Sequence, residues 1–508
     1  MKTFQITTIN LVVTVLVCVC LVANQAVALS VIDSGTSDPC DPCTGQEFYR
    51  TDRNIHKVYD GSQWVEQDLA VFNVKAYGAK GDGTTNDTNS INAALSAVPA
   101  AGGKVYFPAG SYLISFPLSV PSNCAVIGEG WQSKLVAPAN EADFAFFVNS
   151  DIESGNTNLR FANIHIVGNR VNNTTWDPNQ CFGIHLRQSS DIIIENVFVE
   201  EIARDVGIAL RDCNDFVIRN CLLKNIHNTA IYVDANTAGN SDGVITGNIV
   251  QKTYLGNGIF LAEGFHDITI SDNQITDTAD CGIEVGATPK SGLSNRYVTV
   301  SGNVLDHCGD GILLRNADFI NCTGNNCSYG AANGIALWPD SITAIHNNII
   351  GNVCHDNNDH GIKIAHNARQ TVVSGNNCYH NVESGIWSEG DQQDLLITSN
   401  VCSDNNDHGI TYAGNNAGGF LGENLVISNN ICRDNDLYGI SVWNGLDVAI
   451  TGNNCHDTRV GGAKHQQYGI ITGDSSDYAV IVGNSCRGNL TGGITASGAN
   501  NEIDHNIQ

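Results

Sequence analysis

From about residue 180 to the C-terminus, apolar and polar positions follow one short phrase that returns every 23 to 30 residues, most often every 24. Each phrase has a small residue and Ile, then alternating positions, a turn, and a second strand-like stretch that runs into Asn. Similarity at a fixed period of this length indicates stacked structural repeats. Alternation with a period of two, and no period of 3.6, indicates that each repeat is a coil of β-strands. The small residue and Ile recur at Gly183-Ile184, Gly207-Ile208, Ala230-Ile231, Gly258-Ile259, Gly282-Ile283, Gly311-Ile312, Gly334-Ile335, Gly361-Ile362, Gly385-Ile386, Gly409-Ile410, Gly439-Ile440, Gly469-Ile470 and Gly493-Ile494.

The recurring Asn suits a tight turn, because its side chain bonds nearby backbone and tolerates the left-handed region. We expect the Asn amides of stacked coils to bond one another in a ladder. The predicted ladder contains Asn196, Asn220, Asn248, Asn273, Asn303, Asn326, Asn352, Asn377, Asn400, Asn430, Asn454 and Asn484.

A cysteine column accompanies this Asn. The position after the recurring Asn holds Val, Ile or Gln in other coils, so we predict that its cysteines are buried thiols that behave as small hydrophobic groups. Disulfides between coils are the alternative, since stacked strands allow the Cα separation, but their side chains point the same way. Cys40 and Cys43, outside the repeat, favour a local disulfide or free thiols over a metal site. The column members are Cys221, Cys327, Cys354, Cys378, Cys402, Cys432, Cys455 and Cys486, among 18 cysteines in the chain.

The N-terminus has the pattern of a secretory signal over residues 1–28. Lys2 gives a positive start, Leu11 to Ala23 is apolar, and Ala26-Val27-Ala28 is a small-x-small cleavage site. The apolar run is short for a membrane span. We therefore expect an exported protein, secreted or at the cell surface or in a periplasm. Residues 29–69 are expected to form a linker and a small β-hairpin.

Residues 71 to 115 have a different pattern. Ile91 to Val98 is predicted to form an amphipathic helix with Asp87 or Thr88 as its N-cap, followed by the strand-like phrase Gly102 to Gly110. The helix should plug the open end of the first coil and cover its edge strand.

This stretch, with the coil repeat, resembles the pectate-lyase-like right-handed parallel β-helix superfamily. The likeness is strongest to the branch that holds rhamnogalacturonase/epimerase-like domains, mannuronan C5-epimerase catalytic modules and phage tailspikes. It covers about residues 70–508 and implies an all-β, right-handed parallel β-helix with an N-terminal capping helix. The resemblance predicts the fold more specifically than it predicts the reaction, because one fold hosts many functions.

The formal charge of −27 and the pI of about 4.7 argue against nucleic-acid binding, which needs a basic face. The acidic balance is compatible with Ca²⁺ as a cofactor. An acidic polymer could bind at a local basic groove or through a bridging cation. The sequence stops within a coil at Gln508; polar side chains or another subunit in a homo-oligomer could cover that end, or the chain is a fragment.

Candidate chemistry lies on the strand that follows each small residue. Because Ile faces inward, the residues two and four positions after the small residue face outward. The first outward column is His185, Ala209, Tyr232, Phe260, Glu284, Leu313, Ala336, Lys363, Trp387, Thr411, Ser441, Ile471 and Thr495. The second is Arg187, Arg211, Asp234, Ala262, Gly286, Arg315, Trp338, Ala365, Glu389, Ala413, Trp443, Gly473 and Ser497.

Four residues on three adjacent coils fit β-elimination or C5 epimerisation of a uronate chain. Arg211, with Arg187 as the alternative, could neutralise the sugar carboxylate so that the C5 proton becomes acidic. His185 and Tyr232 could take and deliver the proton. Asp234 could orient Arg211 or bind Ca²⁺. The alternative is a surface ion pair of Arg211 and Asp234 beside a surface histidine.

Outward aromatic rings on a flat sheet suit stacking against sugars, or they cover the sheet beneath loops. A second candidate patch combines His360, Lys363, His366, Trp387 and Glu389. The residues predicted to bind substrate are Arg187, Phe260, Glu284, Arg315, Trp338, Lys363 and Trp387.

The chain departs from the epimerases it resembles. Where they carry Asp-Pro-His, this sequence has Ala209-Leu210-Arg211, although Asp234 falls where they also have Asp, one coil later. The Asn-Thr-Asp-Gly phrase of polygalacturonase-like hydrolases is absent from the sequence. The sequence therefore favours lyase or epimerase action on an acidic polysaccharide. A non-catalytic carbohydrate-binding, adhesin or tailspike-like protein is the second interpretation, and a glycoside hydrolase the third.

Overall fold

The computed structural model describes residues 33–35, 47–50, 55–59, 61–66, 71–140, 144–173, 181–235, 240–262, 264–286, 295–339, 343–414, 422–473 and 476–508. The chain divides into two compact units, Met1–Asp68 and Leu69–Gln508. The predicted signal at 1–28 and the two cysteines at positions 40 and 43 lie outside the described residues.

The first unit contains one four-stranded sheet. β2 runs antiparallel to β3, and β3 to β4, while β1 pairs with β2 in parallel. The strands are β1 (Asp33–Gly35), β2 (Glu47–Arg50), β3 (Ile55–Tyr59) and β4 (Trp64–Glu66).

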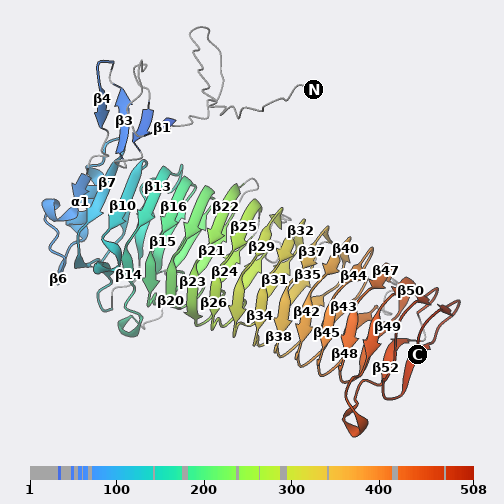
Figure 1. Ribbon diagram of the computed structural model, residues 1–508. Helices are drawn as coiled ribbons and strands as arrows, with labels where there is room; N and C mark the ends of the chain where they lie inside the picture. The colour runs from blue at the N-terminus through green and yellow to red at the C-terminus, as the bar shows by residue number, and fades with distance from the viewer. Residues whose placement is uncertain are drawn as a thin grey trace, which may run out of the picture. The chain divides into compact units, whose positions relative to one another are not determined.

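The second unit is a parallel β-helix whose coils stack from one end to the other (Figure 1). Each coil adds one strand to each of three parallel sheets, so residues at the same point of successive coils become neighbours. The candidate chemistry lies on one sheet, called the groove sheet here. Its strands are β9 (Leu118–Val120), β12 (Ala145–Asn149), β15 (Phe182–Arg187), β18 (Ile208–Arg211), β21 (Ile231–Asp234), β24 (Ile259–Leu261), β27 (Ile283–Val285), β31 (Ile312–Arg315), β35 (Ile335–Trp338), β39 (Ile362–Ile364), β43 (Ile386–Glu389), β46 (Ile410–Ala413), β49 (Tyr438–Trp443), β52 (Tyr468–Thr472) and β54 (Gly492–Ala496).

The other two sheets complete each coil. The second sheet contains β6 (Asp82–Asn86), β8 (Gly110–Leu113), β11 (Ser133–Val136), β14 (His165–Val167), β17 (Phe198–Glu200), β20 (Leu222–Ile226), β23 (Ile249–Thr253), β26 (Gln274–Thr276), β30 (Val304–Asp306), β34 (Asn326–Ser328), β38 (Val353–His355), β42 (Asn377–Tyr379), β45 (Val401–Ser403), β48 (Ile431–Arg433) and β51 (Asn454–His456). The third contains β5 (Val71–Asn73), β7 (Gly103–Phe107), β10 (Cys124–Gly128), β13 (Thr157–Ala162), β16 (Ser190–Glu195), β19 (Asn214–Arg219), β22 (Asn240–Thr246), β25 (Phe265–Ser271), β28 (Asn295–Arg296), β29 (Thr299–Ser301), β32 (Ala317–Asp318), β33 (Asn321–Thr323), β36 (Ala344–Ile345), β37 (Asn348–Ile350), β40 (Ala368–Arg369), β41 (Val372–Ser374), β44 (Leu396–Thr398), β47 (Gly422–Ser428), β50 (Gly445–Thr451), β53 (Val480–Val482) and β55 (Glu502–Asp504).

One continuous apolar core fills the β-helix. The repeated Ile after each small residue is fully buried from Ile184 to Ile470 in the coils where it was predicted. The alternation predicted from the sequence is therefore confirmed. It leaves the neighbouring positions of the groove sheet facing outward.

The Asn ladder is present, but three of its predicted members are displaced by one residue. In the adjacent pairs at 325–326, 376–377 and 453–454 the first Asn enters the ladder, because the second already begins the next strand. Thus Asn325, Asn376 and Asn453 are ladder residues, and Asn326, Asn377 and Asn454 are not. Asn196 and Asn220 instead occupy the left-handed turn position that precedes the ladder. The ladder runs through Asn248, Asn273, Asn303, Asn325, Asn352, Asn376, Asn400, Asn430, Asn453, Asn484 and Asn506, with side-chain bonds of 2.9 to 3.0 Å.

The cysteine column is confirmed as buried free thiols, with one correction. Cys221 precedes its strand and occupies the ladder position, where its backbone amide donates to Asn248. The stacked column begins at Cys327 and pairs in register from coil to coil. Its members are Cys327, Cys354, Cys378, Cys402, Cys432, Cys455 and Cys486, all buried and free.

The capping helix α1 spans Thr88–Ser96, three residues before the predicted start. It lies at the N-terminal end of the β-helix (Figure 1), where Ile91, Ala94 and Leu95 join the core. Asp87 is the N-cap by position, but its carboxylate accepts from the amides of Lys80 and Gly81 rather than from the helix. The 3-10 helices are η1 (Val74–Tyr77), η2 (Gly130–Gln132), η3 (Arg170–Asn172) and η4 (Gly461–Ala463). Within the described residues, no helix has the length and apolarity needed to cross a membrane.

Candidate functional site

The groove sheet brings the predicted residues together in two columns. His185 lies beside Ala209, which lies beside Tyr232, and the same column continues through Phe260 to Glu284. In the second column Arg187, Arg211 and Asp234 are neighbours on successive strands. The predicted crowding of charged and aromatic side chains on three coils is therefore present.

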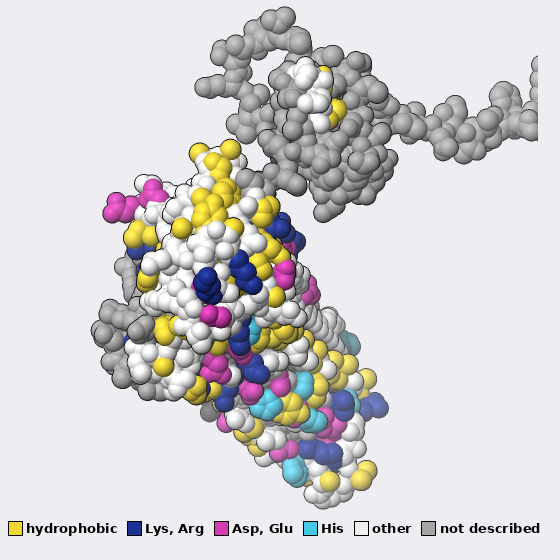
Figure 2. Space-filling view, turned by 90° about the vertical axis from the view of Figure 1, so that its left-hand side faces the viewer, with side chains coloured by type: hydrophobic (Ala, Val, Ile, Leu, Met, Phe, Trp, Pro, Cys, Tyr) yellow, Lys and Arg dark blue, Asp and Glu magenta, His cyan; other side chains and the backbone are white. Residues whose placement is uncertain are grey.

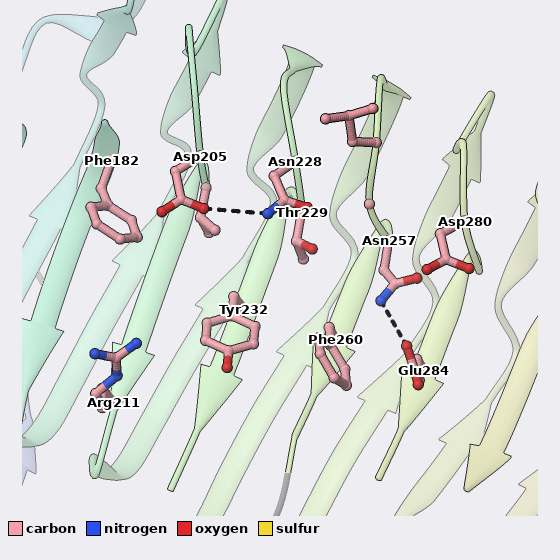
Figure 3. A pocket seen from close by; sticks show the side chains of 13 residues that line it. Phe182, Asp205, Arg211, Asn228, Thr229, Tyr232, Asn257, Phe260, Asp280 and Glu284 are labelled. Carbon is pink, nitrogen blue, oxygen red and sulfur yellow. Dashed lines mark hydrogen bonds between the residues drawn. The ribbon is translucent and has the colours of Figure 1, made fainter. Parts of the chain in front are cut away.

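A cleft of about 370 Å³ opens on this sheet. It collects Arg211, Tyr232, Phe260 and Glu284 from the strands (Figure 3), together with polar side chains from the turns that precede them. The lining residues are Phe182, Asp205, Val206, Arg211, Asn228, Thr229, Tyr232, Leu255, Gly256, Asn257, Phe260, Asp280 and Glu284.

Arg211 is the cationic group of the cleft. Its Nε lies 3.5 Å from Oδ2 of Asp234, and both side chains are half-buried. This contact fits either prediction, an Asp234 that orients the guanidinium or a surface ion pair, and a pair this long is a loose one. A second pair joins Arg315 Nε to Glu284 Oε1 at 3.3 Å.

Tyr232 stays protonated in this setting. Burial, and then the carboxylate of Asp234, raise the pKa of the Tyr232 phenol. The ring packs against Phe260 with centroids 5.4 Å apart. A phenol held in its neutral form is a proton donor rather than a base.

His185 lies beside the cleft rather than in its lining. Its ring packs on Phe182, with centroids 4.2 Å apart, and Phe182 is the residue that reaches the cleft. Burial, with Arg211 and Arg187 nearby, lowers the pKa of His185 to about 4. The imidazole is thus neutral near pH 7 but a weaker base than an ordinary histidine.

Five polar lining residues were not predicted: Asp205, Asn228, Thr229, Asn257 and Asp280. They come from the turn that enters each strand. Asp205 and Asp280 occupy the same repeat position, three residues before the Ile, so aligning the repeats at that turn could have revealed them. Burial raises the pKa of Asp205, while a hydrogen bond from Asn228 at 3.4 Å and the charge of Arg211 oppose the rise.

Glu284 is held at the far end of the cleft. Asn257 Nδ2 donates to its Oε2 at 2.8 Å (Figure 3). Burial is the largest influence and raises the pKa of Glu284, although Arg315 lowers it. The cleft therefore has carboxyl groups with raised pKa values at both ends, Asp205 and Glu284.

The remaining predicted binding residues lie outside the cleft lining. Arg187 is the strand neighbour of Arg211, and Arg315 the neighbour of Trp338. Lys363 and Trp387 are neighbours on β39 and β43, further along the same sheet. The predicted groove thus continues beyond the cleft as a column of outward side chains.

Metal-binding groups are not concentrated anywhere in the described part of the chain. No three His, Cys, Asp or Glu side chains there gather closely enough to hold a metal ion. Asp82 accepts hydrogen bonds from the amides of Thr84 and Thr85. On the face shown in Figure 2, Lys and Arg side chains lie among Asp, Glu and His side chains.

Two family models match the chain. "Rhamnogalacturonase A/epimerase, pectate lyase-like" covers residues 71–166, and "Right handed beta helix region" covers 139–295 and 291–455. The second spans more than half of the sequence.

Curated relatives include enzymes and virion proteins. The pre-neck appendage protein of Bacillus phage B103 is 25% identical over 249 residues, which are 49% of this chain and 24% of that protein. Mannuronan C5-epimerase AlgE5 of Azotobacter vinelandii is 25% identical over 230 residues, 39% of this chain and 23% of the epimerase. The matched stretches thus span about a quarter of either relative.

Among solved structures, the N-terminal fragment of gene product 12 of bacteriophage Phi29 is similar, with 12% identity and a TM-score of 0.48. The likeness covers 84% of this chain and 93% of that fragment.

Proposed function

The chain belongs to the right-handed β-helix family, and on that premise we propose that it modifies a uronate-containing polysaccharide by removing the C5 proton of a bound sugar. Lyases and C5-epimerases share this step. The observation that carries the proposal is the cleft, where a guanidinium, a protonated phenol and a carboxyl of raised pKa line one space. The predicted signal would bring this cleft to extracellular polymers.

Arg211 has the charge that the step requires. When the C5–H bond breaks, its electron pair moves toward the sugar carboxylate, and the negative charge on that group grows. A fixed guanidinium stabilises this charge more in the transition state than in the ground state. The loose contact with Asp234 leaves Arg211 able to turn part of its donor set toward the substrate.

We assign the base to Asp205, which feels the charge of Arg211, rather than to Glu284, which pairs with Arg315; His185 is the alternative. Basicity rises with pKa, so burial makes Asp205 a stronger base than an ordinary carboxylate. The same influence makes His185 a weaker base than an ordinary imidazole. Asp205 also lines the cleft, whereas His185 lies behind Phe182.

Tyr232 supplies the returning proton in either outcome. In a lyase, the electron pair forms a C4–C5 double bond, the glycosidic C4–O bond breaks, and the phenol protonates the leaving oxygen. In an epimerase, the phenol protonates C5 from the opposite face. The raised pKa of Tyr232 keeps its proton available up to alkaline pH.

A non-catalytic binding role is the second candidate. It is favoured by Ala209-Leu210-Arg211, which stands where the epimerases that the chain resembles carry Asp-Pro-His. It is also favoured by the phage appendage relative. In that case Arg211 and Asp234 form a surface ion pair, and the cleft holds a glycan without changing it.

Proton NMR with a panel of polyuronates and neutral glycans, in deuterated buffer with and without Ca²⁺, separates these outcomes. Unsaturated uronate signals identify a lyase, and deuterium at C5 in an uncleaved chain identifies an epimerase. New saturated reducing ends would instead identify a hydrolase. Binding of a glycan with unchanged spectra would contradict the proposal and favour the binding role.

A further inference from the structure

We propose that a second glycan-binding site lies on the groove sheet, apart from the cleft, and holds another part of the same polysaccharide strand. This site, called the platform, consists of Trp338, His360, Lys363, Trp387 and Glu389. The identity of the glycan rests on the proposed function. The proposal that one polysaccharide chain contacts two separate sites does not rest on it.

Contacts with neighbouring side chains fix the indole ring of Trp387 in a position suited to stacking. Its ring lies parallel to His360, with centroids 5.0 Å apart and planes 14° apart. Its Nε1 donates to Glu389 Oε2 at 3.1 Å. One face of the indole is thus supported by protein and its edge is fixed, so a sugar can stack on it with little loss of conformational entropy.

Lys363 provides a cation at the centre of the platform. Its Nζ lies 5.1 Å from the centroid of Trp338 and 3.7 Å from Glu389 Oε1. The contact with Glu389 is longer than an ordinary hydrogen bond. The ammonium can therefore turn a proton toward a sugar carboxylate while it keeps its contact with the indole of Trp338.

The platform and the cleft share one sheet and one outward column. Tyr232 on β21 and Lys363 on β39 occupy the same position five coils apart. At the ~4.8 Å spacing of stacked strands this is roughly 24 Å. Between them, Leu313 and Ala336 are buried in a small apolar cluster with Cys281, and Trp338 packs against this cluster. An extended glycan along the helix axis would reach both sites.

A buried polar atom beside the platform also lacks a partner. His408 follows His360 at the same repeat position two coils later, and its ring stacks on Tyr438 at 4.9 Å. Within the described residues its Nδ1 is buried without a hydrogen bond. Because this atom is buried, a bound sugar would not reach it, and His408 is not counted among the platform residues.

Two contacts on one strand make binding depend on glycan length. Once the first part of the strand is bound, the second part meets its site at a high effective concentration. An oligomer of about ten sugar units would engage both sites, whereas a trimer would engage one. Loss of the platform should therefore affect long oligomers and spare short ones.

Titration calorimetry of the full chain with trimers and with oligomers of about ten units, taken from the polyuronates, tests this. We expect Trp387→Ala to weaken binding of the long oligomer about tenfold, and binding of the trimer less than about twofold. Trp387→Phe, which keeps a ring over His360, should stay within about threefold of the unmodified protein. Trp131→Ala is the matched control, because Trp131 is exposed and packs on Phe198 of the second sheet.

Equal loss for both lengths, or no loss for either, would overturn the proposal, as would failure of the unmodified protein to bind any polyuronate oligomer. The two proposals fail separately. Length-dependent loss without turnover would overturn the proposed function and support the platform. Turnover of long substrate that is unchanged by Trp387→Ala would support the proposed function and overturn the platform.

Discussion

The coils around the cleft and the coils around the platform have the same three strands but different interiors. From Cys327 onward, one slot on the second sheet holds a thiol in every coil through Cys486. In the coils near the cleft, strand pairing aligns larger aliphatic residues with this position, among them Val199, Leu223 and Val250. The C-terminal half is therefore the regular one, and the cleft lies where the repeat varies.

The two regions also treat polar groups differently. Asn376 in the regular half donates to Asn400 and to the carbonyl of Ile349, and accepts from Asn352. Near the cleft, Nε of Arg187 and Nε of Arg211 are buried without a hydrogen bond among the described atoms. Unsatisfied groups and shifted pKa values cost stability, and they concentrate at functional sites. Nδ1 of His408 in the regular half also lacks a hydrogen bond among the described atoms, so the feature that favours the cleft is the combination of these guanidinium groups with a carboxyl of raised pKa at Asp205.

The largest expected effect comes from removing the cation of the cleft. Arg211→Ala should lower turnover of polyuronate about 10²–10³-fold, because the charge that grows on the sugar carboxylate loses its stabilising partner. Glycan binding should change much less. Arg219→Ala, which breaks the pair with Glu195 on the third sheet, is the control and should leave turnover unchanged. Equal activity of Arg211→Ala and Arg219→Ala would remove Arg211 from the mechanism.

Substitutions of Asp205 and of His185 show which of the two residues is the base. Asp205→Asn should lower turnover about 10²-fold or more, because the amide cannot accept the C5 proton. His185→Gln should lower it by less than about tenfold, since His185 lies outside the cleft lining. Initial rates with one polyuronate check this. The reverse order of effects would make the histidine the base.

Neighbouring asparagines in the regular half test the ladder. Asn376→Ala should lower the free energy of unfolding by about 2–3 kcal/mol, because several buried bonds are lost and their partners are left unsatisfied. Asn377→Ala, one residue later, should cost less than about 0.5 kcal/mol, because Asn377 lies outside the ladder. Denaturant unfolding of both variants provides the comparison. Similar costs would contradict the assignment of Asn376 to the ladder.

The last prediction is a pH dependence of stability. The pKa values of His185 and His360 are lowered to about 4, mainly by burial. The unfolded chain therefore binds protons that the folded chain does not, and stability should fall as pH drops from about 6.5 to about 4.

Unfolding midpoints near pH 7 and near pH 5 measure this loss. The loss should be smaller in His185→Gln than in the unmodified protein. His266→Gln, at an exposed histidine, should lose as much stability as the unmodified protein. An identical loss in all three proteins would contradict the role of His185.

The sequence was sufficient for the architecture because the repeat is expressed in side-chain type. Small-Ile pairs gave the inward positions, and the columns placed Tyr232 beside Phe260 correctly. It failed by one residue at Asn325-Asn326, because two adjacent asparagines satisfy the same pattern and only strand pairing separates them. An alternating pattern therefore predicts on which face of a sheet a residue lies better than it predicts where a strand begins.

The cleft was less predictable than the sheet beneath it. Arg211 and Tyr232 were identified from outward columns, which follow from the period of two. Asp205 and Asp280 come from turns, where the period does not apply, so their place in the lining depends on loop path. The pKa of Asp205 is raised by burial, which the sequence does not show.

Breakage of the C5–H bond of a uronate is the step that we propose for the cleft. Release of hydrogen isotope to solvent from a polyuronate labelled at C5 tests it most directly, since both lyase and epimerase chemistry release that label and hydrolysis does not. We expect release by the unmodified protein and by Arg219→Ala, and little release by Arg211→Ala. Retention of the label at C5 in a polyuronate that the protein binds or cleaves would contradict it.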